Sequence, residues 1–150
     1  MLVAARAMQS GLMLLKPRLV EGGVKATGKV VLGTVKGDLH DIGKSLVGMM
    51  LEGAGFEVID LGTDVPPARF AEVARASGAD IVTLSALLTT TIPRMKEFIE
   101  LLQESGLRDR YKVIVGGAPV TKEFANMIGA DGYGADAPRA SEVTRRLLAK

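Results

Sequence analysis

The sequence predicts an α/β domain in which helices cover both faces of a parallel β-sheet. From residue 29 onward, five short runs rich in β-branched and apolar residues each precede a stretch with helical periodicity. The runs at 81–84 and 113–115 do not alternate with polar residues, which is typical of strands buried on both faces. Glycines stand where four of the helices are expected to end, and two prolines stand where one is expected to begin.

The strands are expected at residues 29–35, 56–60, 80–84, 111–115 and 131–133, and the helices at residues 42–54, 66–77, 92–105, 121–128 and 137–149. Five βα units of this length predict a doubly wound, flavodoxin-like sheet with strand order 2-1-3-4-5. The winding reverses between the first and third strands, and ligands bind outside the carboxyl ends of the strands at that point. The loops expected to bind a ligand are 36–41, 61–65, 85–91, 116–120 and 134–137.

One further helix is predicted before the sheet, over residues 2–21. Its apolar stripe consists of Met8, Leu12, Leu15 and Leu19. Pro17 interrupts the helix and a glycine pair ends it, and a linker then runs to residue 28. We therefore expect a helix and linker over residues 1–28 and one α/β domain over residues 29–150.

Composition excludes several classes of function. The chain has 150 residues, a net charge of only +2, scattered basic residues and no tryptophan, which argues against nucleic-acid binding. It contains no cysteine, so disulfides, thiolate metal sites and iron–sulfur clusters are excluded, and a reducing cytoplasm is the expected location. No apolar run approaches the roughly 18 residues that span a bilayer, so no membrane partner is expected.

The first of the ligand-binding loops contains the only histidine of the chain, His40, two residues after Asp38. Asp38 can accept a hydrogen bond from one ring nitrogen, which fixes the tautomer and leaves the other nitrogen free to bind a metal. Gly37 and Gly43 allow a bulky ligand to approach the backbone. The alternative at this stage is an exposed histidine without function beside two carboxylates.

A single histidine is a poor site for a bare transition-metal ion, which requires three or four ligands. A metal bound through His40 alone therefore has to bring its other ligands with it. The residues thus point to a macrocycle, either a haem or a corrin.

The loop after the third strand is rich in hydroxyl groups, carried by Ser85, Thr89, Thr90 and Thr91. Thr90 or Thr91 is expected to cap the following helix, which leaves the other hydroxyls unexplained. Because this loop faces the first loop in the predicted strand order, one hydroxyl can extend a network from His40 and Asp38. Glycines also follow the fourth strand and flank Tyr133 after the fifth, where they either admit a ligand or form tight turns.

Taken together, these residues resemble the cobalamin-binding domain of corrinoid methyl-transfer proteins and of methionine synthase. The signature of that family is Asp-x-His-x-x-Gly, then Ser-x-Leu, then Gly-Gly, after the first, third and fourth strands. In this chain the three parts occur in order, over residues 38–43, 85–87 and 116–117. The resemblance covers residues 29–150.

The resemblance implies a role for each residue of the signature. His40 would bind cobalt in place of the corrinoid's own base, Asp38 would hold His40, and Thr91 would stand where methionine synthase has a serine in the same relay. The nucleotide tail would enter a slot between the first and third strands. The implied cofactor-binding residues are Gly37, Asp38, Leu39, His40, Asp41, Ile42, Gly43, Ser85, Leu87, Thr89, Gly116, Gly117, Tyr133 and Ala137.

The resemblance also implies a function and partners. The chain would carry a methyl group on cobalt in one-carbon metabolism, loaded by a substrate-specific methyltransferase and unloaded by an acceptor methyltransferase, with a reductive activator. It would be a carrier subunit and not a complete enzyme. Such carriers usually have a helical bundle before the cobalamin domain, and residues 2–21 resemble only its last helix. The apolar stripe of that helix indicates self-association or docking on a partner.

Four alternatives compete with this interpretation. A cobalamin-binding subunit of an adenosylcobalamin-dependent mutase shares Asp-x-His-x-x-Gly, but its third loop tends to lack the run of threonines. A phosphate-binding P-loop is suggested by Gly43-Lys44-Ser45, but the spacing from Gly37 is one residue too long and Asp38 and Asp41 would repel phosphate. Receiver and flavin-binding domains fit poorly, since the former needs an acidic residue where this chain has Ser85.

Overall fold

Five parallel strands form the central sheet of the computed structural model, which describes residues 7, 10 and 27–149. The strands are β1 (Lys29–Thr34), β2 (Glu57–Asp60), β3 (Ile81–Ser85), β4 (Lys112–Gly116) and β5 (Gly132–Gly134). Their order is β2-β1-β3-β4-β5, which confirms the predicted topology. The register places Thr34 beside Ser85 and Ser85 beside Gly116, so β1, β3 and β4 end at the same level.

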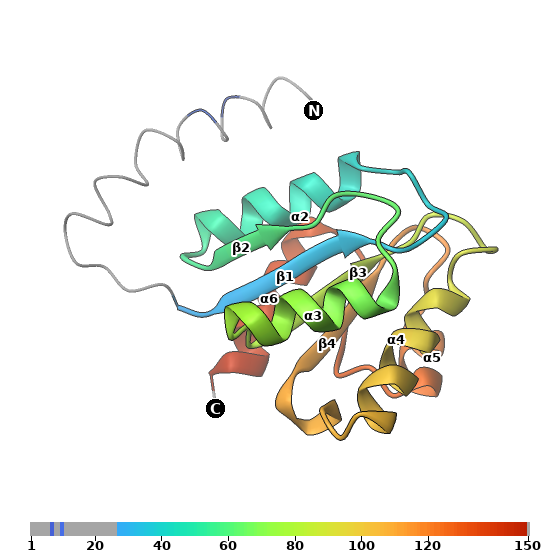
Figure 1. Cartoon of the computed structure of the whole chain (residues 1–150). Coiled ribbons are helices and arrows are strands. Elements are labelled where there is room, and N and C mark those ends of the chain that lie inside the picture. The colour runs from blue at the N-terminus through green and yellow to red at the C-terminus, as the bar shows by residue number, and fades with distance from the viewer. Residues whose placement is uncertain (1–6, 8–9, 11–26, 150) are drawn as a thin grey trace.

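Helices cover both faces of the sheet (Figure 1). They are α2 (Ile42–Gly53), α3 (Pro67–Ser77), α4 (Pro93–Glu104), α5 (Lys122–Ile128) and α6 (Ala137–Leu148), with a short 3₁₀ helix at Arg108–Arg110 that was not predicted. The helix expected over residues 2–21 and its linker lie outside the described residues, apart from positions 7, 10, 27 and 28. Within the part of the chain that the structure describes, no helix is long and apolar enough to cross a membrane.

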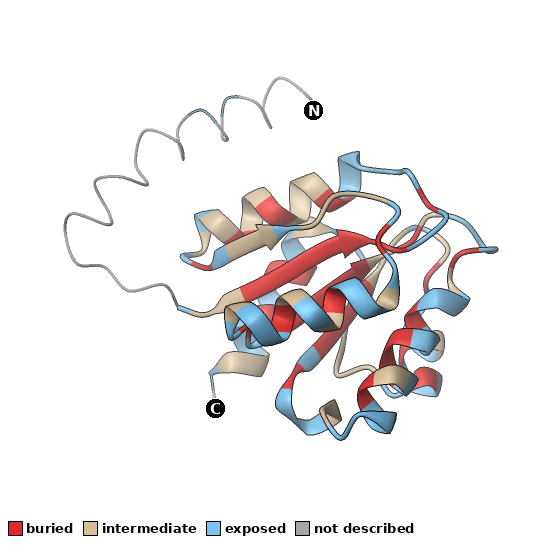
Figure 2. Ribbon diagram, in the orientation of Figure 1, coloured by how far each residue is buried: buried red, intermediate tan, exposed pale blue. Residues whose placement is uncertain are grey.

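Two apolar layers hold the sheet between the helices. On one face, alternate strand residues such as Val82 and Val115 pack against α3, α4 and α5, and Phe70 meets Phe98 edge-on at 5.8 Å. On the other face, the strand residues Val30, Ile81 and Ile114 pack against α2 and α6. Figure 2 shows the central strands buried along their length and much of the loop edge exposed. The core therefore fixes the positions from which the loops emerge.

The β4–α5 loop passes so close to β3 that only glycine fits at its start. Gly117 has a φ of +130°, and a Cβ atom there would lie 1.8 Å from the carbonyl oxygen of Ala86. A Cβ on Gly116 would lie 2.7 Å from the carbonyl oxygen of Gly134. The sequence left open whether this glycine pair admits a ligand or forms a tight turn. The structure gives another reason that is sufficient by itself, since both residues pack against neighbouring backbone.

We predict that Gly117→Ala destabilises the chain by about 3 kcal/mol, because the clash is with backbone atoms that have no free space to move into. Chemical denaturation measures the loss. Gly43→Ala is the matched control, since a Cβ at Gly43 meets nothing within 4 Å among the described residues and its φ is not positive. Equal stabilities of Gly117→Ala and the wild type would contradict the packing argument.

Candidate functional site

A buried carboxylate, that of Asp38, organises the loop edge of the sheet. Its side chain is fully buried. One oxygen, Oδ1, lies 2.7 Å from Nδ1 of His40 and accepts a hydrogen bond from the His40 backbone N–H at 3.1 Å. The other oxygen, Oδ2, accepts from the Leu87 N–H at 2.7 Å and from the Thr91 hydroxyl at 2.8 Å. The structure thus brings together His40, Asp38 and Thr91, as the sequence predicts.

This environment keeps Asp38 ionised. Burial by itself raises the pKa of the Asp38 carboxyl, but the hydrogen bonds from the Leu87 N–H, from His40 and from Thr91 outweigh it. The pKa falls from its ordinary value of 3.8 to about 2. At neutral pH a full negative charge therefore faces Nδ1 of His40.

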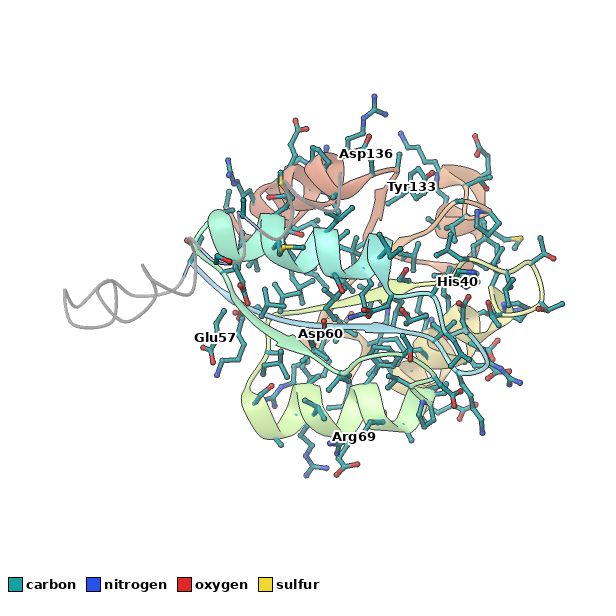
Figure 3. All side chains as sticks on the ribbon, turned by 90° about the horizontal axis from the view of Figure 1, so that it is seen from above. His40, Glu57, Asp60, Arg69, Tyr133 and Asp136 are labelled. Atoms are coloured by element: carbon teal, nitrogen blue, oxygen red, sulfur yellow. The ribbon has the colours of Figure 1, made fainter. Side chains whose placement is uncertain are left out.

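The His40 ring is oriented by this charge and remains accessible. Its side chain is 52% exposed. Because Asp38 accepts a hydrogen bond from Nδ1, the lone pair of Nε2 is available to a metal. The backbone carbonyl of His40 accepts a hydrogen bond from the Thr34 hydroxyl at 2.8 Å, which ties the loop to the end of β1. Figure 3 shows His40 at the loop end of the sheet.

The expectation that Thr90 or Thr91 caps the next helix is wrong. The helix α4 begins at Pro93, Ile92 is its N-cap residue, and no side chain caps it. The Thr91 hydroxyl lies instead within hydrogen-bond distance of Oδ2 of Asp38 and of the Leu88 carbonyl, at 2.8 and 3.0 Å. A buried carboxylate is a stronger acceptor than ordinary neutral groups, so the tertiary contact prevails over the local cap.

Large apolar side chains surround His40 on the surface. Leu39 and Ile42, on either side of His40 in the chain, are 74% and 65% exposed, and Leu88 in the facing loop is 39% exposed. Folding normally removes such side chains from water. Exposed apolar side chains in the same loops as a polarised histidine indicate a surface that binds a ligand or a partner.

A cavity of about 360 Å³ opens beside this surface, between the sheet and the helices α2 and α6. The predicted residues that line it are Gly43, Ser85, Leu87, Gly116, Gly117 and Ala137. Thr89 is exposed and lies outside the lining. Tyr133 also lies outside it, because its side chain packs with the α3–α5 layer on the opposite face, where its hydroxyl donates to the Val120 carbonyl at 2.9 Å.

Sequence reasoning missed several residues of the lining, among them Thr83 on β3 and Leu46 and Val47 on α2. Thr83 could have been found, since it lies two residues before Ser85 and therefore on the same face of the strand. No such signal marks Leu46 and Val47 of α2. Apolar residues recur with the same helical spacing whether their side chains line a cavity or fill the core.

A second charged cluster fixes the start of α2. Lys44 is buried, and its Nζ lies 2.8 Å from Oδ1 of Asp41 and 2.7 Å from Oδ1 of Asp60. The hydrogen bond from Lys44 lowers the pKa of Asp41. The lysine that suggested a P-loop is therefore paired with two carboxylates and does not point to a phosphate. Among the described residues, no group of three or more histidine and acidic side chains could hold a bare metal ion.

Comparisons with known proteins agree with this site. The sequence pattern of the B12 binding domain family matches residues 28–141. Dimethylamine corrinoid protein 3 of Methanosarcina mazei is 50% identical over 149 residues, which make up 99% of this chain and 89% of the relative.

Solved structures give the same result. A cobalamin-binding protein from Desulfitobacterium hafniense is 39% identical, with a TM-score of 0.81 over 95% of this chain and 67% of its own. The methanol:cobalamin methyltransferase complex MtaBC of Methanosarcina barkeri has a chain that is 32% identical, with a TM-score of 0.83 over 99% of this chain and 56% of that one. The resemblance found from three short motifs is confirmed, and the chain belongs to the B12 binding domain family.

Proposed function

We propose that this chain binds a corrinoid through His40 and carries a methyl group between methyltransferases. The observation that carries the proposal is the buried Asp38 carboxylate, which lies 2.7 Å from Nδ1 of the exposed His40 ring and so leaves Nε2 free. The same carboxylate accepts a hydrogen bond from the N–H of Leu87, a residue that lines the cavity. When bound, the corrinoid supplies the cobalt chemistry of methyl transfer. The protein supplies one ligand, its orientation and the cavity.

The site fits both the flat macrocycle and the nucleotide tail of such a cofactor. The apolar side chains of Leu39, Ile42 and Leu88 suit the flat macrocycle, which brings the other metal ligands with it. The cavity suits an elongated tail, and its lining is mostly apolar or small. Roles for His40, Asp38 and Thr91 follow from this fit. Asp38 orients the ring of His40, and the Thr91 hydroxyl holds one oxygen of Asp38.

The partners belong to the same proposal. One relative is named a dimethylamine corrinoid protein, and a similar structure is part of a methanol:cobalamin methyltransferase complex. We therefore propose one methyltransferase that loads the carrier from a small methylated compound and a second that unloads it, with a reductive activator. The adenosylcobalamin mutase alternative has no comparable support, because these named relatives are methyl-transfer proteins.

The proposed function gives three predictions, and the first concerns the nitrogen atom that binds cobalt. In the reduced, paramagnetic cobalt form, ¹⁵N labelling of the protein should change the nitrogen splitting of the electron paramagnetic resonance spectrum, because the coordinating atom is Nε2 of His40. The splitting from protein nitrogen should vanish in His40→Ala and persist in Thr90→Ala, an exposed neighbour of the network. An unchanged pattern on labelling would assign the ligand to the corrinoid's own base.

The second prediction concerns Asp38 in the corrinoid-free protein. A carboxyl whose pKa falls from 3.8 to about 2 on folding contributes about 2 kcal/mol of stability above pH 4, and this contribution disappears as the pH falls through 2. Asp38→Asn should therefore lower the free energy of unfolding at pH 7 by about that amount. Urea denaturation at pH 7 and pH 3 should show the gap between wild type and variant narrowing by about 1 kcal/mol. A gap independent of pH would refute the electrostatic account.

The third prediction separates folding from binding at Gly43. The fold leaves open space around this residue, which lines the cavity. Gly43→Ala should leave the stability of the corrinoid-free chain unchanged or raise it by up to about 1 kcal/mol. It should weaken binding of cobalamin about tenfold, because the added methyl group takes up space at the mouth of the cavity. Titration followed by absorption measures the affinity. Equal affinities of Gly43→Ala and the wild type would contradict this prediction, because they would show that the cavity accommodates the added methyl group.

A further inference from the structure

One residue in the loop after β2 has a backbone conformation that side chains disfavour. Asp64 has a φ of +54°, and among the described residues it is the one non-glycine residue with a positive φ. Aspartate adopts this left-handed region more readily than most residues, but glycine adopts it with less strain. A strained residue at a position that suits glycine indicates that its side chain makes an interaction of functional value.

In this conformation Asp64 forms two hydrogen bonds with the loop that carries His40. Its carboxylate oxygen Oδ1 accepts from the N–H of Gly37 at 2.8 Å, and its own N–H donates to the carbonyl of Asp38 at 3.0 Å. Both partners are backbone groups of the loop after β1, next to the carboxylate that orients the His40 ring. Asp64 therefore fixes the backbone from which the Asp38 side chain extends.

The fold itself has little need of the Asp64 carboxylate. The residue is exposed, so water would satisfy the N–H of Gly37 if the carboxylate were removed. Backbone bonds already join the two loops, since the N–H of Thr34 donates to the Gly62 carbonyl and the N–H of Val65 donates to the Thr34 carbonyl. A glycine at position 64 would lose one exposed hydrogen bond but relieve the strain, so its two effects on stability oppose each other.

We propose that Asp64 is a positioning residue for the cobalt ligand, acting on His40 through the backbone of residues 37 and 38. The proposal rests on the corrinoid binding proposed above. The other end of the loop is held in a similar way, because the hydroxyl of Thr34 donates to the His40 carbonyl at 2.8 Å. Neither Asp64 nor Thr34 belongs to the Asp-x-His-x-x-Gly signature. A loop held at both ends keeps one conformation, so metal binding need not order it.

The test is a double-mutant cycle that measures the affinity of the full chain for hydroxocobalamin by absorption titration. Asp64→Gly should weaken binding about tenfold, because the loop then has to be ordered when the metal binds. In the His40→Ala background the same substitution should change the affinity less than about twofold, because the residue through which Asp64 acts is absent. Asp64→Asn should bind like the wild type, because its amide oxygen accepts the same hydrogen bond and asparagine tolerates a positive φ.

Asp80 offers a matched control at the end of the sheet where the strands begin. It is exposed, its carboxylate accepts from the N–H of Lys29 at 2.9 Å, and its own N–H donates to the Lys29 carbonyl at 2.9 Å. Asp80→Gly removes a bond of the same kind and should leave the affinity unchanged. A second readout is electron paramagnetic resonance of the reduced cobalt form. A smaller share of the bound cobalt should show the splitting from protein nitrogen in Asp64→Gly than in Asp64→Asn.

The outcomes separate this inference from the proposed function. Equal affinities of Asp64→Gly and the wild type, or an equal loss in both backgrounds, would overturn the positioning role. Asp64→Asn binding as weakly as Asp64→Gly would overturn it too, and so would an Asp64→Gly variant that no longer unfolds cooperatively in urea, which would make Asp64 a residue of the fold. A wild type that binds no hydroxocobalamin, or binds it no more tightly than His40→Ala does, would instead refute the ligand role of His40, on which the proposed function rests.

Discussion

The buried carboxylate of Asp38 is the group on which the loop edge depends. Its two oxygens join the β1–α2 loop to the β3–α4 loop through His40, Leu87 and Thr91. Its backbone carbonyl accepts a hydrogen bond from the N–H of Asp64 at 3.0 Å, which brings in the loop after β2. A buried anion needs hydrogen-bond donors at its carboxylate oxygens, and His40, Leu87 and Thr91 supply them. Hydrogen bonds to the single residue Asp38 therefore join three loops that are distant in sequence.

Residues on both sides of His40 in the sequence restrain its position. Asp38 fixes the ring, while Asp41, the residue after His40, is paired with the buried Lys44 at the start of α2. Lys44 in turn pairs with Asp60 at the end of β2. In the proposed role of metal ligand, a side chain restrained in this manner would lose little conformational freedom on binding, so little binding free energy would go into ordering the loop.

The sequence predicts most of the fold because its signals are local. Glycines at the helix ends and uniformly apolar strands place each element to within a residue of its observed bounds. The failures come from tertiary context. A cap was expected at Thr91 because capping is a local rule, and the Asp38 carboxylate that competes with it lies 53 positions away in sequence. The family resemblance implied that Tyr133 binds the cofactor, whereas its side chain packs in the α3–α5 layer. The sequence could not show this, because β5 is three residues long and two of them are glycine, which leaves no alternation from which to predict the face of Tyr133.

Small residues occur around the cavity for two different reasons. Some are required by the packing of the fold, and others are not. Gly116, Gly117 and Gly134 are required by neighbouring backbone or by α6, because a Cβ on any of them would collide with the protein itself. Within the part of the chain that the structure describes, the fold has no such need of Gly43, since a Cβ there would meet nothing within 4 Å, or of the Thr83 hydroxyl, which is buried without a hydrogen-bond partner. Both lower the stability of the empty chain relative to alanine and valine. Gly43 and Thr83 both line the same cavity, and residues that the fold alone would not favour are expected where a protein binds a ligand.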